Sequence, residues 1–251
     1  RQIYGMSFNN SKLKCLTMNT TADISNELQK QIPNKSSFKY LGALLSADGY
    51  YESEIARRIG LAKDEFSSLR RCWQHSSVSI KRKYQIYTTT VLSKLMYGLE
   101  TATLRASNTA KLNGFHAACC RRILRISPSY ISRVSNKYIL GAIGSVELSL
   151  IIRSRQLKFF GKLARRDGDD LLRSFVFKPH SFEMTMPANR KQGRPRATWK
   201  ADMHKHATLA AHPDSLQACI ADEAVWHRTV AKYCALSAVS AYNEDHPCAR
   251  R

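Results

Sequence analysis

Residues 38–49 read Phe-Lys-Tyr-Leu-Gly-Ala-Leu-Leu-Ser-Ala-Asp-Gly. The first half alternates aromatic or aliphatic residues with polar or small ones, which is typical of a half-buried strand. Gly42 interrupts the strand at a point where backbone or a ligand can approach closely, and residues 46–49 favour a turn. The pattern predicts a short β-hairpin. Such a hairpin is either an ordinary structural element or, beside the basic helix that follows it, a holder of a nucleic-acid end.

A helical stripe follows the hairpin over residues 52–73. Acidic residues lie in its first turn and arginines in its last, which matches the helix dipole. Arg57, Arg58 and Lys63 lie off the stripe, so the helix is expected to have an apolar side and a basic side. A basic side is either solvated or faces phosphate, and the persistence of bases along this helix favours phosphate. The apolar stripe recurs at steps of three or four residues, at Ile55, Ile59, Ala62, Phe66, Leu69 and Trp73.

Helical spacing continues to residue 166. A second helix follows Ser79 and begins with Lys81, Arg82 and Lys83, where the helix dipole disfavours cations. This local cost suggests an anion contact, and solvated lysines are the commoner alternative explanation. A third helix is expected from a cap at Ser107 or Asn108 to about residue 126, and a short helix over 135–144. The fourth, over 146–166, is the most basic. The cations near the ends of the third and along the fourth helix are Arg121, Arg122, Arg125, Arg153, Arg155, Lys158, Lys162, Arg165 and Arg166.

The C-terminal third changes character. Residues 167–170 carry three carboxylates beside a glycine and are interpreted as a boundary loop, because carboxylates on neighbouring residues of a turn rarely converge on one metal ion. Residues 178–192 are polar and lack periodicity, which predicts a linker. A last helix is expected over 222–242. His and Cys residues are frequent here, but no zinc-finger spacing occurs, so no metal site is predicted.

Composition points to a polyanion as partner. The chain has 251 residues, with 40 Lys and Arg against 19 Asp and Glu and a formal net charge of +21. Such an excess favours nucleic acid, while an anionic membrane surface stays open. No apolar run of about 18 residues occurs, so no transmembrane span is predicted. Seven cysteines, an odd number with two adjacent, make a poor disulfide framework and favour a reducing compartment, the cytoplasm or nucleus.

A family resemblance rests on several blocks in order. Residues 38–42 (Phe-Lys-Tyr-Leu-Gly), a turn and residues 54–63 (Glu-Ile-Ala-Arg-Arg-Ile-Gly-Leu-Ala-Lys) resemble the primer-grip hairpin and thumb start of non-LTR (LINE-type) retrotransposon reverse transcriptases. Tyr-Gly-Leu-Glu-Thr at 97–101 is similar to the family's Tyr-Gly-Ser-Glu-Thr. Arg-Arg-Ile-Leu-Arg-Ile at 121–126, Leu-Lys-Phe-Phe-Gly-Lys at 157–162 and Gly-Arg-Pro-Arg-Ala-Thr-Trp at 193–199 extend the resemblance over about residues 5–230.

The resemblance implies a mainly α fold, a helical thumb-like bundle with a small N-terminal β element formed by the palm edge and primer-grip hairpin. Four parts are expected: a palm remnant with the hairpin (1–50), a thumb-like region (51–166), a loop and linker (167–192) and a basic helical region (193–251). The primer grip would be Phe38, Lys39, Tyr40, Leu41 and Gly42.

Residues 5–16 resemble the palm motif that follows the family's catalytic aspartates. Lys12 aligns with the lysine placed near the phosphates of the incoming nucleotide, although Leu13 stands where the family prefers Thr. A polar turn between two short strands is the alternative. The aspartate pair that would hold Mg²⁺ in the full-length enzyme lies upstream of this motif. We therefore expect neither a catalytic residue nor a cofactor in this chain, and no polymerase activity from it alone.

The expected function is that of a C-terminal fragment of an RNA-directed DNA polymerase. It would grip RNA and DNA, as an RNA/DNA duplex with its primer end, through phosphate contacts and beside the palm and fingers region upstream. Gly193-Arg194-Pro195-Arg196 resembles the core of an AT-hook and adds Arg194 and Arg196 as phosphate or groove contacts. The alternative is a non-catalytic basic helical module, decayed or repurposed, that binds an acidic protein.

Overall fold

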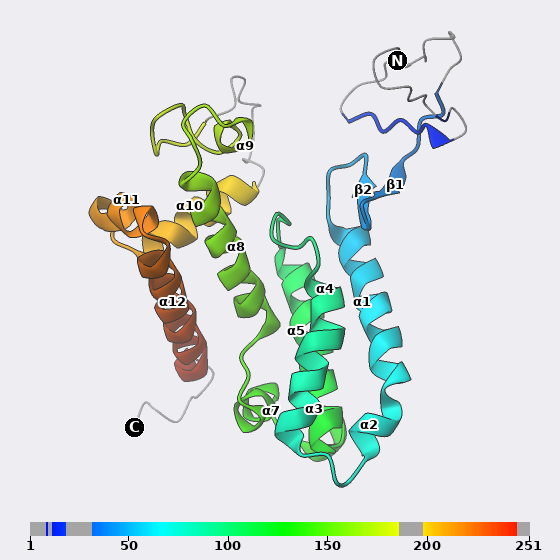
Figure 1. The fold of residues 1–251 in the computed structure, drawn as a ribbon. Coiled ribbons are helices and arrows are strands. Elements are labelled where there is room, and N and C mark those ends of the chain that lie inside the picture. The colour runs from blue at the N-terminus through cyan, green and yellow to red at the C-terminus, as the bar shows by residue number, and fades with distance from the viewer. Residues whose placement is uncertain (1–8, 10–11, 19–31, 186–197, 245–251) are drawn as a thin grey trace. The chain divides into compact units, whose positions relative to one another are not determined.

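The computed structural model describes residue 9 and residues 12–18, 32–185 and 198–244 (Figure 1). It is mainly helical, and among the described residues the strands form one two-stranded antiparallel sheet near the N-terminus. The prediction of a mainly α fold with a small N-terminal β element is confirmed. The chain divides into two compact units, Arg1–Arg58 and Ile59–Arg251, and the boundary falls within helix α1 (Glu52–Ser68).

The first unit contains the predicted hairpin. Strand β1 (Ser37–Tyr40) pairs with β2 (Ala43–Ser46) in a register that sets Tyr40 opposite Ala43, so only Leu41 and Gly42 form the loop. Both loop residues have positive φ, 45° and 82°. This is the backbone that two-residue hairpins require because it matches the twist of the strands. Gly42 accepts it freely, whereas Leu41 has a Cβ that makes it costly.

Helix α1 stops earlier than the stripe predicted. Leu69 interrupts it, and α2 (Arg70–Gln74) continues as a separate short helix. The indole N–H of Trp73 donates to the Phe66 carbonyl at 2.7 Å. A side chain that takes over a helix carbonyl in this way breaks the backbone ladder and allows a kink. The rings of Phe66 and Trp73 then stack with centroids 4.8 Å apart.

A π-helical turn interrupts the second predicted helix. Helix α3 (Ile80–Tyr87) begins after Ser79, as predicted, and the Ser79 side chain caps it by accepting from Arg82 N–H. A π-helical turn (Thr88–Leu92) separates it from α4 (Ser93–Met96). The Thr88, Thr89, Thr90 and Ser93 hydroxyls donate to carbonyls three or four residues earlier, which weakens regular α-helical geometry.

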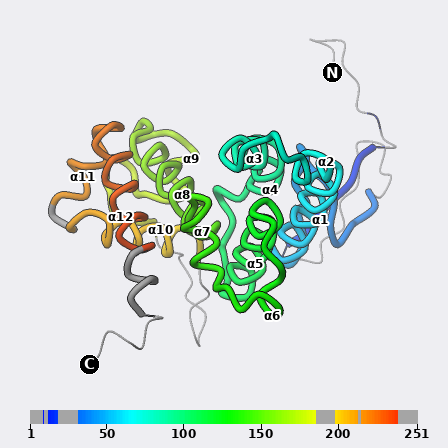
Figure 2. Tube along the Cα trace, turned by 90° about the horizontal axis from the view of Figure 1, so that it is seen from below, coloured from blue at the N-terminus to red at the C-terminus, as the bar shows by residue number. Residues whose placement is uncertain are grey.

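Three more helices, α5, α6 and α7, follow α4. Helix α5 (Ala106–Leu124) starts after Arg105, not after the predicted Ser107 or Asn108, and α6 (Ser129–Ser132) and α7 (Asn136–Ile143) follow it. The predicted short helix over 135–144 is confirmed, with Ser135 as N-cap and Gly144 in the left-handed region at its end. Figure 2 shows α3, α5 and α7 gathered together, and each contacts the other two.

A buried hydrophobic cluster of the unit Ile59–Arg251 forms around α8 (Leu148–Ala164). Helices α9 (Leu171–Ser174), α10 (Trp199–Ala210), α11 (Pro213–Ala221) and α12 (Glu223–Glu244) follow it. Helix α12 lies along α8 in Figures 1 and 2, and the Trp226 indole donates to the Leu157 carbonyl at 2.9 Å. Helices α10 and α11 were not predicted. The four-part division stays a prediction, although α8 shares its buried cluster with the region that follows it.

Candidate nucleic-acid interface

The five predicted primer-grip residues form the outer part of the hairpin. Phe38 is partly buried, whereas Lys39 and Gly42 are exposed. Tyr40 and Leu41 are 57% and 77% exposed, which is unusual for large apolar side chains. The tip thus presents an aromatic ring, an aliphatic side chain and one ammonium group to the surroundings. A tip of this kind can contact a sugar or base through its apolar groups and a phosphate through Lys39.

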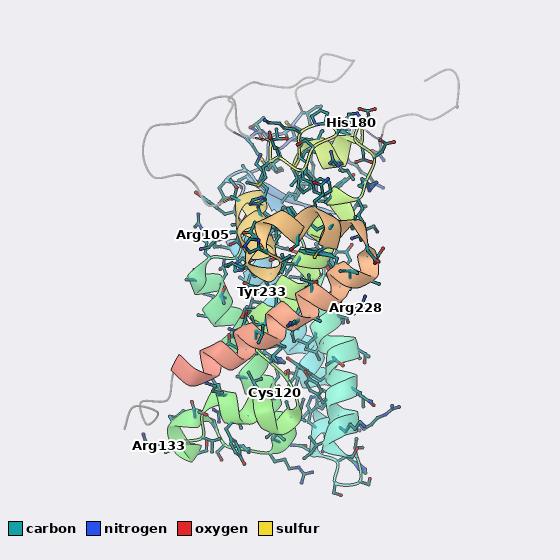
Figure 3. The ribbon with its side chains drawn as sticks, turned by 90° about the vertical axis from the view of Figure 1, so that its left-hand side faces the viewer. Arg105, Cys120, Arg133, His180, Arg228 and Tyr233 are labelled. Atoms are coloured by element: carbon teal, nitrogen blue, oxygen red, sulfur yellow. The ribbon has the colours of Figure 1, made fainter. Side chains whose placement is uncertain are left out.

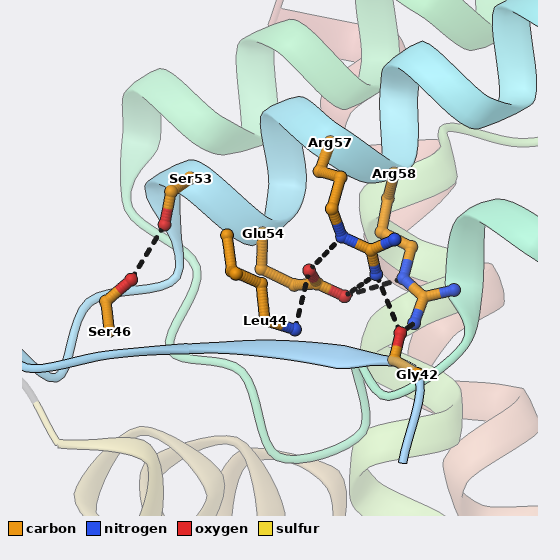
Figure 4. A network of polar contacts seen from close by, with 7 residues as sticks. All are labelled: Gly42, Leu44, Ser46, Ser53, Glu54, Arg57 and Arg58. Carbon is orange, nitrogen blue, oxygen red and sulfur yellow. Dashed lines mark hydrogen bonds and ion pairs between the residues drawn. The ribbon is translucent and has the colours of Figure 1, made fainter. Parts of the chain in front are cut away.

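A carboxylate in α1 holds this hairpin in place (Figure 4). Glu54 accepts the Leu44 N–H at 3.0 Å, both Nε and Nη2 of Arg57 at 2.7 and 2.8 Å, and Nε of Arg58 at 2.7 Å. Both arginines also donate through Nη2 to the Gly42 carbonyl, at 2.7 Å each. We call Gly42, Leu44, Glu54, Arg57 and Arg58 the hairpin latch. It ties the loop and second strand to the first turns of α1.

The electrostatics of the hairpin latch favour the ionised carboxylate. Burial of Glu54, whose side chain is 3% exposed, raises the pKa of the carboxyl group. The hydrogen bonds from Arg57, Arg58 and Leu44 N–H lower that pKa and together outweigh burial, so the pKa lies below its ordinary value. A buried ion pair of this geometry is costly to break, because loss of one partner leaves the other charge uncompensated.

Eight of the predicted phosphate-contacting cations have polar partners among the described residues, and one of them is exposed Arg82, which donates to Gln85 Oε1 at 3.3 Å. Arg57 and Arg58 bind Glu54 and the Gly42 carbonyl in the hairpin latch. Buried Lys83 donates to the Trp73 carbonyl at 2.9 Å. Buried Arg121 donates to Asn136 Oδ1 at 2.9 Å and to the Val134 carbonyl. The other three are in ion pairs, Arg153 with Asp202, Arg165 with Glu223 and Arg166 with Asp170.

Burial limits three of these cations as phosphate ligands. A guanidinium or ammonium group that is buried and already satisfied cannot reach a phosphate without first losing its partners. This applies to Arg58, Lys83 and Arg121, which are 6%, 3% and 5% exposed. The side chains of Arg57, Arg153, Arg165 and Arg166 are 18% to 37% exposed, and their predicted phosphate contacts stay predictions. In this structure these seven cations hold the hairpin, the end of α2, the α6–α7 segment and the helices that pack on α8.

The other predicted cations face solvent. Lys158 and Lys162 are four residues apart on α8 and therefore share one face of that helix. The buried residues Leu157, Phe160 and Leu163 occupy the remaining faces. The exposed cations of the predicted interface are Lys63, Arg70, Arg71, Lys81, Arg82, Arg122, Lys158 and Lys162. None of these eight forms an ion pair with another described residue.

Three further predicted residues lie at the limits of the described chain. Lys12 is exposed, and its N–H donates to the Asn9 carbonyl at 3.0 Å, in agreement with a local turn. Its predicted role near a nucleotide phosphate is untested. Arg194 and Arg196 lie outside the described residues.

Buried polar groups between α3 and α5 lie within hydrogen-bond distance of one another. The Tyr87 hydroxyl and His116 Nδ1 are 2.9 Å apart, and His116 Nε2 lies 3.0 Å from Ser145 Oγ. Burial lowers the pKa of His116 to about 4 and raises the pKa of Cys120, labelled in Figure 3, to about 12. The imidazole and the thiol are therefore both neutral at pH 7. In the described part of the chain, no three His, Cys, Asp or Glu side chains gather in a way that could hold a metal ion.

Comparisons with known proteins leave the family open. No family model, no curated protein and no solved structure matches the chain. The resemblance to LINE-type reverse transcriptases therefore rests on the blocks quoted above. Among the described helices, none combines the length and the apolar composition needed to cross a membrane.

Sequence reasoning missed the residue that organises the hairpin. Glu54 was treated only as an acidic group in the first turn of a helix. A local signal was present, because Arg57 and Arg58 stand three and four residues after it, where side chains on a helix meet. The Gly42 carbonyl, to which both arginines donate, is 15 residues before Arg57, so no helical spacing in the sequence indicates this contact.

Proposed function

We propose that this chain is a C-terminal part of a LINE-type reverse transcriptase and that it grips an RNA/DNA duplex through phosphate contacts without carrying out chemistry. The observation that carries the proposal is the set of eight exposed cations on α1 to α5 and α8 that have no ion-pair partner among the described residues. Unpaired cations on a folded surface attract a polyanion and release its counterions on binding.

The helices α1 to α8 would act as the thumb. Their apolar stripes pack inward, while Arg71, Lys81, Lys158 and Lys162 stay in solvent. Contacts of this kind recognise backbone charge and helix shape and read little base sequence. The proposal therefore predicts similar affinity for unrelated duplex sequences of equal length.

The hairpin would hold the primer end. The hairpin latch fixes Gly42 and Leu44 against α1 through six hydrogen bonds, two of them at the Gly42 carbonyl and one at the Leu44 N–H. A tip that is fixed in this way can present Tyr40 and Leu41 with little loss of conformational entropy on binding. The palm edge before it, with Lys12, would adjoin the palm and fingers of the same polyprotein.

The proposal assigns no metal chemistry to the described residues, because the resemblance places the Mg²⁺-binding aspartate pair upstream of residues 5–16. The six described cysteines are free, which fits an intracellular, reducing compartment for the fragment. Competition by polyglutamate for the duplex distinguishes this function from binding to an acidic protein.

Duplex binding by the α8 face tests the proposal. We expect Lys158→Gln/Lys162→Gln to weaken binding of a blunt RNA/DNA duplex, with the salt slope reduced by up to about two. The matched control is Lys178→Gln, which removes one exposed lysine already paired with Glu183 at 2.6 Å. Fluorescence anisotropy with two unrelated duplex sequences measures both quantities. Unchanged affinity and slope in the double variant would exclude α8 from the interface.

A further inference from the structure

Residues 101–146, which include α5, α6 and α7, contain no acidic side chain. The chain has 19 Asp and Glu in 251 residues, so about three or four would be expected in a stretch of this length. The positive charge of this stretch therefore has no carboxylate within the stretch to neutralise it, and a polyanion would supply the counter-charge. Its seven cations are Arg105, Lys111, Arg121, Arg122, Arg125, Arg133 and Lys137.

The connection between α6 and α7 is fixed from inside by Arg121, which is 5% exposed. Its guanidinium donates to the Val134 carbonyl, to Asn136 Oδ1 at 2.9 Å and to Ser132 Oγ at 3.5 Å. The Ser132 amide also donates to the Pro128 carbonyl at 3.0 Å. A backbone that is held before a ligand arrives loses little conformational entropy on binding, so its outer side chains form a prepared contact surface.

Three large side chains of this connection lie in solvent. Tyr130 in α6 is 74% exposed, Ile131 beside it 62%, and Tyr138 in α7 64%. Neither tyrosine side chain has a ring contact or a hydrogen bond with another described residue. Large apolar side chains are usually buried, so three exposed ones within nine residues indicate a surface that contacts a ligand.

An exposed cation stands between the two tyrosines in the sequence. Arg133, labelled in Figure 3, follows α6 and has a left-handed backbone with φ 56°. Its guanidinium forms no hydrogen bond or ion pair with another described residue, and is therefore available to an external anion. We call Tyr130, Ile131, Arg133 and Tyr138 the α6–α7 surface.

We propose that the α6–α7 surface binds unpaired nucleotides of a nucleic-acid strand, with bases stacked on Tyr130 and Tyr138 and a phosphate at Arg133. Stacking of bases on aromatic side chains beside cations is sequence-tolerant, because every base has a π-face. This inference rests on the proposed function and deepens it, since it assigns to the chain a single-stranded segment in addition to the duplex.

Charge and exposure favour unpaired nucleotides over other ligands. Bases of a duplex present only their edges in the grooves, so a duplex would leave the tyrosine rings unused. An acidic peptide matches the charge of residues 101–146, but only a nucleotide brings a flat apolar group with each negative charge. A membrane-binding helix needs a wide apolar face, whereas α7 buries its Ile139 and Leu140 in the core.

Strands with and without bases test the inference in the full chain. The probes are a strand of about ten thymidine nucleotides, the same strand with every base removed, and a blunt RNA/DNA duplex. The two strands carry equal numbers of phosphates, so the difference in their affinities isolates the contribution of the bases. The test variant Tyr130→Ser/Tyr138→Ser removes both rings. The matched control Tyr130→Phe/Tyr138→Phe keeps both rings and removes only the hydroxyls.

We expect the thymidine strand to bind roughly fivefold or more tightly than the abasic strand, since stacking of even one base is worth this much. The serine variant should lose this preference, whereas the phenylalanine control should keep it and the affinity for the blunt duplex should change little in both. Arg133→Gln should weaken binding of both strands and reduce the salt slope by about 0.7.

Two further measurements support the comparison. Thermal unfolding followed by circular dichroism should be alike in the serine and phenylalanine variants, because Tyr130 and Tyr138 are exposed. With 5-bromouracil in the strand, ultraviolet crosslinks to the unmodified chain should fall on the peptides that contain Tyr130 or Tyr138.

The outcomes separate the two proposals. Equal affinity for the thymidine and abasic strands would overturn the inference and leave duplex binding intact. Absence of binding to all three probes would overturn both the inference and the proposed function. A preference for thymidine that survives Tyr130→Ser/Tyr138→Ser would place base stacking elsewhere and overturn the inference.

Two results would assign the α6–α7 surface to another partner. Binding of phosphatidylserine vesicles that the serine variant loses, with strand binding unchanged, would assign the surface to a membrane. Displacement of the thymidine strand by polyglutamate of equal charge would assign it to an acidic protein.

Discussion

Removal of the Glu54 carboxylate should free the hairpin from α1. Glu54→Ala deletes four hydrogen-bond contacts and leaves the Arg58 side chain, 7% exposed, beside the Gly42 carbonyl without its counter-charge. Loss of one partner of a buried ion pair costs about 3–5 kcal/mol. Arg57 is 23% exposed and can turn to water, so we expect a loss near the lower limit, about 3 kcal/mol.

Hydrogen exchange at the Leu44 amide measures this loss directly. That N–H donates to Glu54, so its protection depends on the hairpin latch and not on the pairing of β2 with β1. A loss of about 3 kcal/mol corresponds to roughly a hundredfold faster exchange if the hairpin opens locally. Amides of the α8 core, such as that of Phe160, should exchange at an unchanged rate because they belong to the other compact unit.

Glu65→Ala is the control for this change. It removes a carboxylate from the same helix that pairs with exposed Lys94, and such surface pairs contribute about 0–1 kcal/mol. Because the pKa of Glu54 is lowered in the folded state, the stabilisation is present above the ordinary pKa of 4.5 and is lost as pH falls through the lowered value. Leu44 exchange that is equally fast in Glu54→Ala and Glu65→Ala would refute the hairpin latch.

Two further predictions concern stability. The pKa of His116 is lowered from 6.5 to about 4, so the unfolded chain binds more protons than the folded chain between these values. The free energy of unfolding should therefore fall by up to about 3 kcal/mol as the pH drops from 6.5 towards 4. His116→Gln should flatten this pH dependence in denaturant titrations. Tyr87 and Cys120 beside it have raised pKa values and do not titrate in this window. Leu41→Gly should stabilise the hairpin by about 0.5–1 kcal/mol, because the φ of 45° is costly for a residue with a Cβ, and slower exchange of the hairpin amides would measure the gain.

Local signals made part of this fold predictable. Helices after Ser79 and over residues 135–144 were predicted, and in the structure Ser79 and Ser135 are their N-caps while Gly144 ends α7 in the left-handed region. A hairpin was also predicted, but its turn was placed at residues 46–49, whereas the loop consists of Leu41 and Gly42. Each of these features depends on residues within a few positions of one another, so a single sequence is sufficient to recognise it.

Features that depend on tertiary contacts were not predictable. The break at Leu69 requires the Trp73 indole to take the Phe66 carbonyl, and an uninterrupted apolar stripe gives no sign of it. Helix α10 buries only Met203 and Ala207 strongly, which is too sparse a pattern to recognise, although Thr198 is a regular N-cap.

The sequence could also not show which of the predicted phosphate-binding cations are covered by other parts of the fold. Periodicity identified a basic side of α1 but could not show that Arg57 and Arg58 turn back onto the hairpin. Buried Arg121 could likewise not be told apart from exposed Arg122 by sequence position, because only the α6–α7 segment decides which guanidinium is covered. Cation positions in the sequence therefore do not show which side chains the fold covers, and the predicted partner class stays a prediction.

The salt dependence of binding to an RNA/DNA duplex tests the central claim most directly. If the eight exposed cations neutralise about six phosphates, affinity of the full chain should fall on the order of a thousandfold between about 50 and 200 mM salt. The fall should be the same for unrelated sequences, and polyglutamate of equal charge should compete poorly. Affinity that does not change with salt, or displacement of the duplex by polyglutamate at equal charge, would contradict the account.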